Sequence, residues 1–273
     1  MYSYRYSNGR ASGNQLRSDH PLQNHEIARV APSVFAAAAH CSRADTYSFV
    51  PTAQVLDRLR SEGFEPFEVR QTNCRKEDKV PFTRHMVRLR HPNMIKADDV
   101  TPEIILLNSH DGTSSYQLLT GFFRSICDNG LVAGNVHSDI RIAHRGNISD
   151  NVIDGCIRVV QNLEQITNRV DEYRGKILKL FDQKEFAAKA MELKWGDVQP
   201  FEPDRLLTAH RYEDSSDSLW NVFNTVQENL LKGGIAGRSA NGRRTRTRGI
   251  RAIDADVKIN KALWQLADEF VEV

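Results

Sequence analysis

The chain has 273 residues, of which 40% are hydrophobic and 26% are charged, and its formal net charge is +2, as is typical of a soluble globular protein. No run approaches the roughly 20 apolar residues of a membrane span, and the start MYSYRYSNGR is too polar for a signal peptide. The cysteines lie far apart, as expected for free thiols of a cytoplasmic protein: Cys41, Cys74, Cys127 and Cys156.

Residues 1–24 are rich in Tyr, Ser, Asn and Gly without hydrophobic periodicity, so they predict a flexible N-terminal arm. Pro32 then opens a predicted short helix over SVFAAAAHCS. A second helix is expected after Thr52, which is placed to cap it, and Gly63 ends it. The apolar face of this second helix consists of Val55, Leu56 and Leu59.

The runs Phe64–Thr72 and Phe82–His91, joined by a charged loop, predict a β-hairpin. Strand alternation turns Val87 and Leu89 to one face of the second strand. The opposite face is basic and consists of Arg84, Met86, Arg88 and Arg90. Two interpretations stay open: a solvated face paired with glutamates of the first strand, or a basic β-surface for a phosphate backbone.

The central stretch begins with Ile104–Leu107, a continuous apolar run that predicts a strand buried on both faces. Turn-forming residues follow over Asn108–Gly112. Apolar residues then recur at steps of three and four, which predicts a helix closed by Gly130: Tyr116, Leu119, Phe122, Phe123 and Ile126. A further strand is expected over Val136–His144.

From Ser149 onward the pattern predicts helices. Ser149 caps an apolar stripe that Gly175 ends, and Asp182 heads the next helix, FAAKAMELK. Asp217 or Ser218 starts a third helix, which Gly233-Gly234 ends, and the last begins near Asp256.

These elements predict an α+β protein, with an N-terminal antiparallel or mixed sheet and packed helices followed by a helical C-terminal region. The expected organisation is an arm at residues 1–24, an α+β core domain at residues 25–147 and a helical region at residues 148–273.

An arginine-rich segment lies at residues 234–253, GIAGRSANGRRTRTRGIRAI, and Lys232 precedes it. It contains no acidic residue and six arginines: Arg238, Arg243, Arg244, Arg246, Arg248 and Arg251. Planar guanidinium groups bind phosphate oxygens bidentately and stack on bases, and uncompensated like charges favour an anionic partner. The alternatives are a solvated surface and a nucleic-acid-binding loop.

Catalytic chemistry has weaker signals. His110 and Asp111 follow a buried strand without a recognisable nucleophile, although a hydrolase or nuclease using them stays an alternative. Cys127 lies among apolar residues, which favours packing, and His137 and His144 lack further ligands at metal-site spacing. Phosphate-loop and dinucleotide fingerprints are absent. No catalytic residue, metal or cofactor is predicted.

Several segments resemble the plasmid- and phage-borne family catalogued as domain of unknown function 932. They include VAPSVFAAAAHCSR, EIILLNSHDGTSSYQLLTGFFRSICDNGLVAG and LWNVFNTVQENLLKGGIAGRSANGRRTRTRGI. The resemblance spans about His20 to Ala267 and implies a mobile-element protein of the bacterial cytoplasm, with no assigned activity and no catalytic residues to carry over.

The predicted order of helix, hairpin, strand and helix is also similar to the core of single-strand annealing recombinases, which form rings around a basic DNA groove. This similarity implies that Arg84, Arg88 and Arg90 supply groove charge, with a backbone contact from Arg124 and a stacking surface from Tyr116.

The leading hypothesis is a non-enzymatic nucleic-acid-binding protein acting in recombination or replication of a mobile element. Single-stranded DNA is the favoured partner, a homo-oligomeric ring is possible, and no membrane contact is expected. The alternative is an interaction protein that counters host defence.

Overall fold

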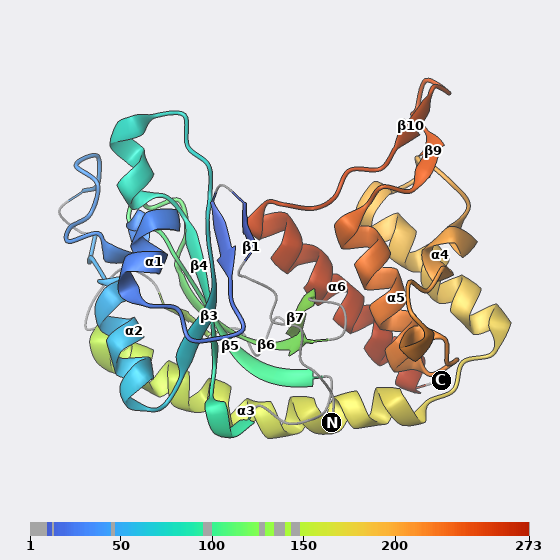
Figure 1. Cartoon of the computed structure of the whole chain (residues 1–273), viewed down its shortest axis with the longest axis horizontal. Coiled ribbons are helices and arrows are strands. Elements are labelled where there is room, and N and C mark those ends of the chain that lie inside the picture. The colour runs from blue at the N-terminus through green and yellow to red at the C-terminus, as the bar shows by residue number, and fades with distance from the viewer. Residues whose placement is uncertain are drawn as a thin grey trace. The chain divides into compact units, whose positions relative to one another are not determined.

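A computed structural model describes residues 10–12, 14–44, 47–94, 100–125, 129–133, 140–142 and 148–272 (Figure 1). The chain divides into two compact units. The first contains Met1–Ile126 with His137–Leu163, and the second contains Cys127–Val136 with Glu164–Val273. Among the described residues, no helix is long and apolar enough to cross a membrane.

The first unit is built on an antiparallel sheet in which each strand pairs with the next along the chain. Its strands are β1 (Arg10–Ser12), β2 (Gln15–Arg17), β3 (Glu65–Gln71), β4 (His85–Arg90), β5 (Val100–Asn108) and β6 (Tyr116–Arg124). A further strand, β8 (Ile140–Ile142), pairs with the start of β6. The predicted hairpin, the buried strand and the α+β class are confirmed.

The segment after Gly112 is a strand, so the helix predicted from Tyr116 is wrong. β6 pairs with β5 from Leu107↔Gln117 to Val100↔Arg124. Because both faces of β6 are buried, apolar residues occur at even and odd positions, and their combined spacing imitates a helix. Gly130 lies inside another strand of the second unit, β7 (Asn129–Ala133), instead of capping a helix.

The predicted N-terminal arm is also corrected from Arg10 onward, because β1 and β2 extend the sheet beside β3. Leu16 and Leu22 anchor this segment in the core, with 5% and 1% of their surfaces exposed. Residues 1–9 lie outside the described part of the chain.

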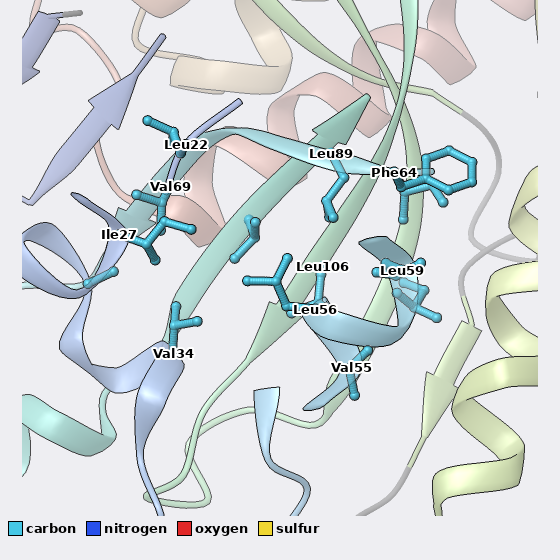
Figure 2. Close-up of a cluster of buried hydrophobic side chains, with 14 of the residues drawn as sticks. Leu22, Ile27, Val34, Val55, Leu56, Leu59, Phe64, Val69, Leu89 and Leu106 are labelled. Atoms are coloured by element: carbon cyan, nitrogen blue, oxygen red, sulfur yellow. The ribbon is translucent and has the colours of Figure 1, made fainter. Parts of the chain in front are cut away.

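Short helices cover one face of this sheet: α1 (Asn24–Val30), the 3-10 helix η1 (Pro32–Phe35) and α2 (Thr52–Ser61). Figure 2 shows their apolar side chains meeting those of the strands, including Ile27, Leu56, Val69 and Leu106. Two further 3-10 helices, η2 (Glu77–Phe82) and η3 (Pro92–Met94), lie in loops.

The helix predicted over SVFAAAAHCS ends after one turn. Ala36 leaves the helical region, with φ −56° and ψ 131°, and the chain then reaches the sheet, where the His40 amide donates to the His110 carbonyl at 2.9 Å. A tertiary hydrogen bond therefore overrides the helix propensity of the alanine run.

Helices dominate the second unit. A long helix, α3 (Ile148–Gly175), starts in the first unit and ends in the second. It is followed by α4 (Leu180–Trp195), the 3-10 helices η5 (Pro203–Leu207) and η6 (Tyr212–Asp214), α5 (Leu219–Lys232) and α6 (Ile253–Glu272). The four predicted helices are confirmed. α4 begins before Asp182, and α6 before Asp256.

The core of the second unit is aromatic. Tyr173 contacts the rings of Trp264 and Phe223 at centroid distances of 5.0 and 6.3 Å. Almost all of α5 is buried, and the hydroxyl of Ser218 caps it by accepting a hydrogen bond from the amide of Asn221. This buried helix supports the arginine-rich segment that follows it.

Candidate nucleic-acid interface

The arginine-rich segment contains a β-hairpin. Strand β9 (Ala236–Arg238) pairs antiparallel with β10 (Arg244–Arg246), and a tight turn connects them. The Gly242 amide donates to the Ser239 carbonyl at 2.8 Å, and Gly242 has a φ of +73°, which glycine adopts at little cost. We call residues 236–246 the arginine ribbon.

Three arginines share one face of the arginine ribbon. Arg238 lies directly opposite Arg244, and Arg246 is two residues further along the same strand, so all three side chains emerge on one side. The other face carries Gly237 and Thr245. The pairing of the two strands therefore holds three guanidinium groups close together on one face, which a mobile loop would not do.

Gly237 allows the ribbon to pack closely against Pro200. A Cβ at this position would clash with the carbonyl oxygen of Pro200, which accepts a hydrogen bond from the Arg238 amide at 2.7 Å. The guanidinium group of Arg205 also donates to the Ala236 carbonyl. The face opposite the arginines thus contacts the loop before η5, which leaves the arginine face directed away from it.

The base of the ribbon is fixed to the C-terminal end of α5. The Gly234 amide donates to the Thr247 carbonyl, and the Ile250 amide donates to Leu231, each at 2.8 Å. Lys194 at the end of α4 donates to the carbonyls of Leu230 and Arg248 at 2.5 and 3.3 Å. Burial lowers the pKa of Lys194 to about 8. The ribbon is therefore held by ordered contacts at its base.

The ribbon's charge is not balanced by carboxylates. Within the described part of the chain, none of the six arginines between residues 238 and 251 forms an ion pair; Arg238 and Arg246 instead donate to backbone carbonyls, at 3.0 and 2.9 Å. Lys232 differs, because it pairs with Glu228 at 2.5 Å. Every residue from 238 to 246 is exposed.

The arginines of β4 lie elsewhere, and the predicted basic β-surface is wrong. Arg88 and Arg90 are 1% and 5% exposed and share the fully buried carboxylate of Glu103, at 2.5 and 2.8 Å. The guanidinium carbon of Arg90 also lies 3.7 Å from the Phe123 ring centroid. The predicted alternation along β4 is correct, but its charged side chains are inside the protein.

A second buried ionic group lies on β3. Glu68 is fully buried and pairs with Arg17 and Arg70 at 2.6 and 2.5 Å. Burial alone would raise the pKa of Glu68, but these guanidinium groups outweigh it and hold the pKa far below its ordinary value. The ion pairs of Glu68 and Glu103 thus join strands of the sheet to one another and lie buried within it.

The other two residues of the sheet that were predicted to contact nucleic acid, Tyr116 and Arg124, are also buried. Tyr116 is fully buried and Arg124 is 2% exposed, so neither meets a base or a phosphate at the surface, and the contacts predicted for them are wrong. Arg84 is half-buried. The described side chains of β4, β5 and β6 are mostly buried on both faces of the sheet, and the similarity to annealing recombinases stays a prediction.

His110 and Asp111 belong to a buried polar network. The Nε2 atom of His110 lies 3.3 Å from the hydroxyl oxygen of Thr52, which also lies 2.9 Å from Nε2 of His85. Asp111 accepts hydrogen bonds from the amide and hydroxyl of Thr113 at 3.0 and 2.6 Å, as in an Asx turn. His110 is fully buried. The contact of His110 joins α2 to the sheet, and those of Asp111 form the turn after β5.

His85 is central to this network. Its Nδ1 atom lies 2.9 Å from the hydroxyl oxygen of Ser33, which donates to Gln71 at 2.7 Å. Burial, reinforced by the neighbouring His110, lowers the pKa of His85 to about 3. A neutral imidazole therefore bridges η1 and α2.

Within the described ranges, no group of three or more His, Cys, Asp or Glu side chains could hold a metal ion. Cys127, His137 and His144 lie outside the described residues.

A protein-family model described as "Domain of unknown function (DUF932)" matches residues 39–264. The chain belongs to the DUF932 family. The UPF0380 proteins YfjQ and YafZ of Escherichia coli (strain K12) are each 43% identical to it over 258 residues, which is 94% of this chain and 94% of theirs. No solved structure matches the chain significantly.

The DUF932 match confirms the family resemblance read from the sequence motifs. It covers the arginine ribbon and also Thr52, His85 and His110, so none of these lies outside the family domain. The family description states no activity, and the function therefore has to be argued from the surface that this chain presents.

One signal for the ribbon was present in the sequence. Asn241-Gly242 lies in the short segment 239–243 between Ala-Gly-Arg and Arg-Thr-Arg, and a loop of three to five residues that contains Gly is typical of a hairpin. The supporting residues Lys194 and Arg205 carry no comparable signal, because only the fold brings them to the ribbon.

Proposed function

We propose that this protein binds nucleic acid through the arginine ribbon, largely without sequence preference, and acts in recombination or replication of a mobile element in the bacterial cytoplasm. The observation that carries the proposal is the arginine face of Arg238, Arg244 and Arg246, which is exposed and lacks ion pairs within the described residues. The proposed cellular process rests on the family resemblance alone.

The electrostatic argument begins with the pair Arg238 and Arg244. Like charges directly opposite each other on neighbouring strands destabilise a hairpin. A carboxylate at either position would relieve the repulsion. A polyanion would relieve it as well, and it would explain why both positions are basic.

The chemistry of arginine favours phosphate as the anion. A guanidinium group presents its N–H donors in a planar fork that matches two phosphate oxygens, and it keeps its charge at any physiological pH. A row of such groups at strand spacing suits a ligand with regularly repeated phosphates. Nucleic acid is the abundant cellular polymer with that property.

The test is a fluorescence-anisotropy titration of labelled oligonucleotides. If about five arginines neutralise single-strand phosphates, the logarithm of the affinity should fall with the logarithm of salt with a slope of roughly −3.5. Raising salt from about 50 to about 200 mM should then weaken binding by roughly two decades.

The matched comparison uses two double variants. Arg238→Ala with Arg244→Ala removes the opposed pair and should weaken binding and flatten the salt slope. Arg75→Ala with Arg29→Ala removes two exposed arginines from the first unit and should leave binding unchanged. No binding at micromolar protein, or equal losses in both variants, would refute the proposal. Self-association into a ring stays a prediction.

A further inference from the structure

The arginine face and the tip of the arginine ribbon are exposed, whereas Gly237 and the amide of Arg238 contact Pro200. All residues from 238 to 246 are exposed, including Thr245 on the face opposite the arginines. Figure 1 shows β9 and β10 extending beyond α4 and α5 within the second unit. A basic hairpin that is fixed at its base and against Pro200, and exposed over its arginine face and its tip, can project into a groove of a ligand.

The width and length of the ribbon restrict the kind of groove into which it can project. Two paired strands lie about 4.8 Å apart, and three steps along a strand advance about 10 Å. The major groove of B-form DNA is about 12 Å wide and about 8.5 Å deep and admits a two-stranded β-ribbon, whereas the minor groove is only about 6 Å wide. Its arginine side chains add to the backbone width, so the ribbon fits the major groove and is too wide for the minor groove.

The side chains of the ribbon also suit a groove. Residues 239–242, Ser-Ala-Asn-Gly, are small, so the tip is narrow. Arg238 and Arg244 lie on different strands, one at each edge, and can reach phosphates on opposite walls of a groove. The whole segment 234–253 lacks an aromatic side chain, the usual platform for unpaired bases.

We infer that the arginine ribbon inserts into the major groove of double-stranded DNA and grips the phosphates of both walls. This inference rests on the proposed function and makes it specific, because a groove-inserting hairpin selects B-form DNA over other nucleic acids. The A-form duplex of RNA has a deep, narrow major groove that excludes such a ribbon.

The experiment compares three labelled ligands of one sequence by anisotropy at equal salt: duplex DNA, duplex RNA and single-stranded DNA. Groove insertion predicts that duplex DNA binds at least about tenfold more tightly than duplex RNA, since the phosphate charges are similar and only the groove differs. For duplex DNA, the double variant of Arg238 and Arg244 should make the salt slope less negative by about 1.8.

A second measurement places the ribbon in the groove. Duplex DNA that carries glucosylated hydroxymethylcytosine has sugar groups filling the major groove and unchanged phosphates, and it should bind at least about tenfold more weakly. Circular dichroism of each variant checks that it is folded.

The outcomes separate the two proposals. Equal affinity for duplex DNA and duplex RNA, or indifference to glucosylation, would overturn groove insertion and leave backbone binding standing. Preference for the single strand would also overturn groove insertion. Absence of binding to all three ligands would overturn the proposed function itself.

Discussion

The buried carboxylate of Glu103 forms ion pairs with two guanidinium groups of the sheet. Its two oxygens accept from Arg88 and Arg90, and all three side chains are almost fully buried. Moving charges out of water is expensive, so such a group is stable only while every member keeps its partner. Polar residues that resemble a surface patch in the sequence are therefore a structural requirement of the first unit.

We expect Glu103→Gln to destabilise the protein by about 3–5 kcal/mol, because the amide keeps the shape but removes the buried negative charge that Arg88 and Arg90 share. Urea denaturation measures the loss. The matched control is Glu62→Gln, which removes an exposed partner of Arg58 and should cost less than about 0.5 kcal/mol. Similar midpoints for the two variants would contradict the buried network.

His85 gives stability a pH dependence. Its pKa is lowered from 6.5 to about 3. Below pH 6.5, His85 is therefore protonated in the unfolded chain but stays neutral in the folded protein. The free energy of unfolding should then fall by about 1.4 kcal/mol for each pH unit as the pH drops below 6.5. Carboxylates with an ordinary pKa of 4.5 act with the same sign lower down, so the measurement is made between pH 6.5 and 4.5.

The measurement is urea denaturation at several pH values within that window. Replacing the imidazole in His85→Gln should lower stability at neutral pH and flatten its pH dependence, whereas His25→Gln on the exposed surface of α1 should retain the slope. A slope unchanged by His85→Gln would show that this histidine is not held neutral.

At the scale of elements, the sequence patterns predicted those with a clear period or a recognisable cap. The stripe of α3, the capped α5 and the hairpin of β3 and β4 follow their periodicities. β6 did not, because its two buried faces remove the alternation on which a strand assignment depends. The arginine-rich composition of residues 234–253 was visible in the sequence, but their hairpin was not predicted, because its strands are short and carry no apolar alternation.

The close contact between the ribbon and Pro200 requires glycine at position 237. We expect Gly237→Ala to cost about 1–3 kcal/mol in the stability of the second unit, because the added methyl group clashes with the carbonyl oxygen of Pro200. It should also weaken DNA binding by loosening the ribbon. Thermal unfolding and anisotropy test the two effects.

A matched substitution is Gly175→Ala at the end of α3, where a Cβ would meet open space and should be neutral or slightly stabilising. If Gly237→Ala behaved in the same way, Gly237 would not be needed for close approach to Pro200.

At the scale of the whole chain, the two compact units differ in where they keep charge. The first unit encloses ionic groups within its sheet, around Glu68 and Glu103. The second pairs Arg211 with the buried carboxylates of Asp214 and Glu228, but it exposes the arginines of the ribbon. Residue types were visible in the sequence for both, but only tertiary contacts decide which arginines meet glutamate and which meet solvent. The candidate interface is therefore confined to the ribbon and its base.

The exposed ribbon has a practical consequence for handling the protein. Trypsin cuts after arginine and prefers accessible segments, so its first nicks should fall between residues 238 and 251, while the buried arginines of β4 survive until the chain unfolds. Bound duplex should shield the same bonds and delay the nick. Digestion followed by mass spectrometry would thus map the footprint of a ligand on the native protein, without any label or substitution.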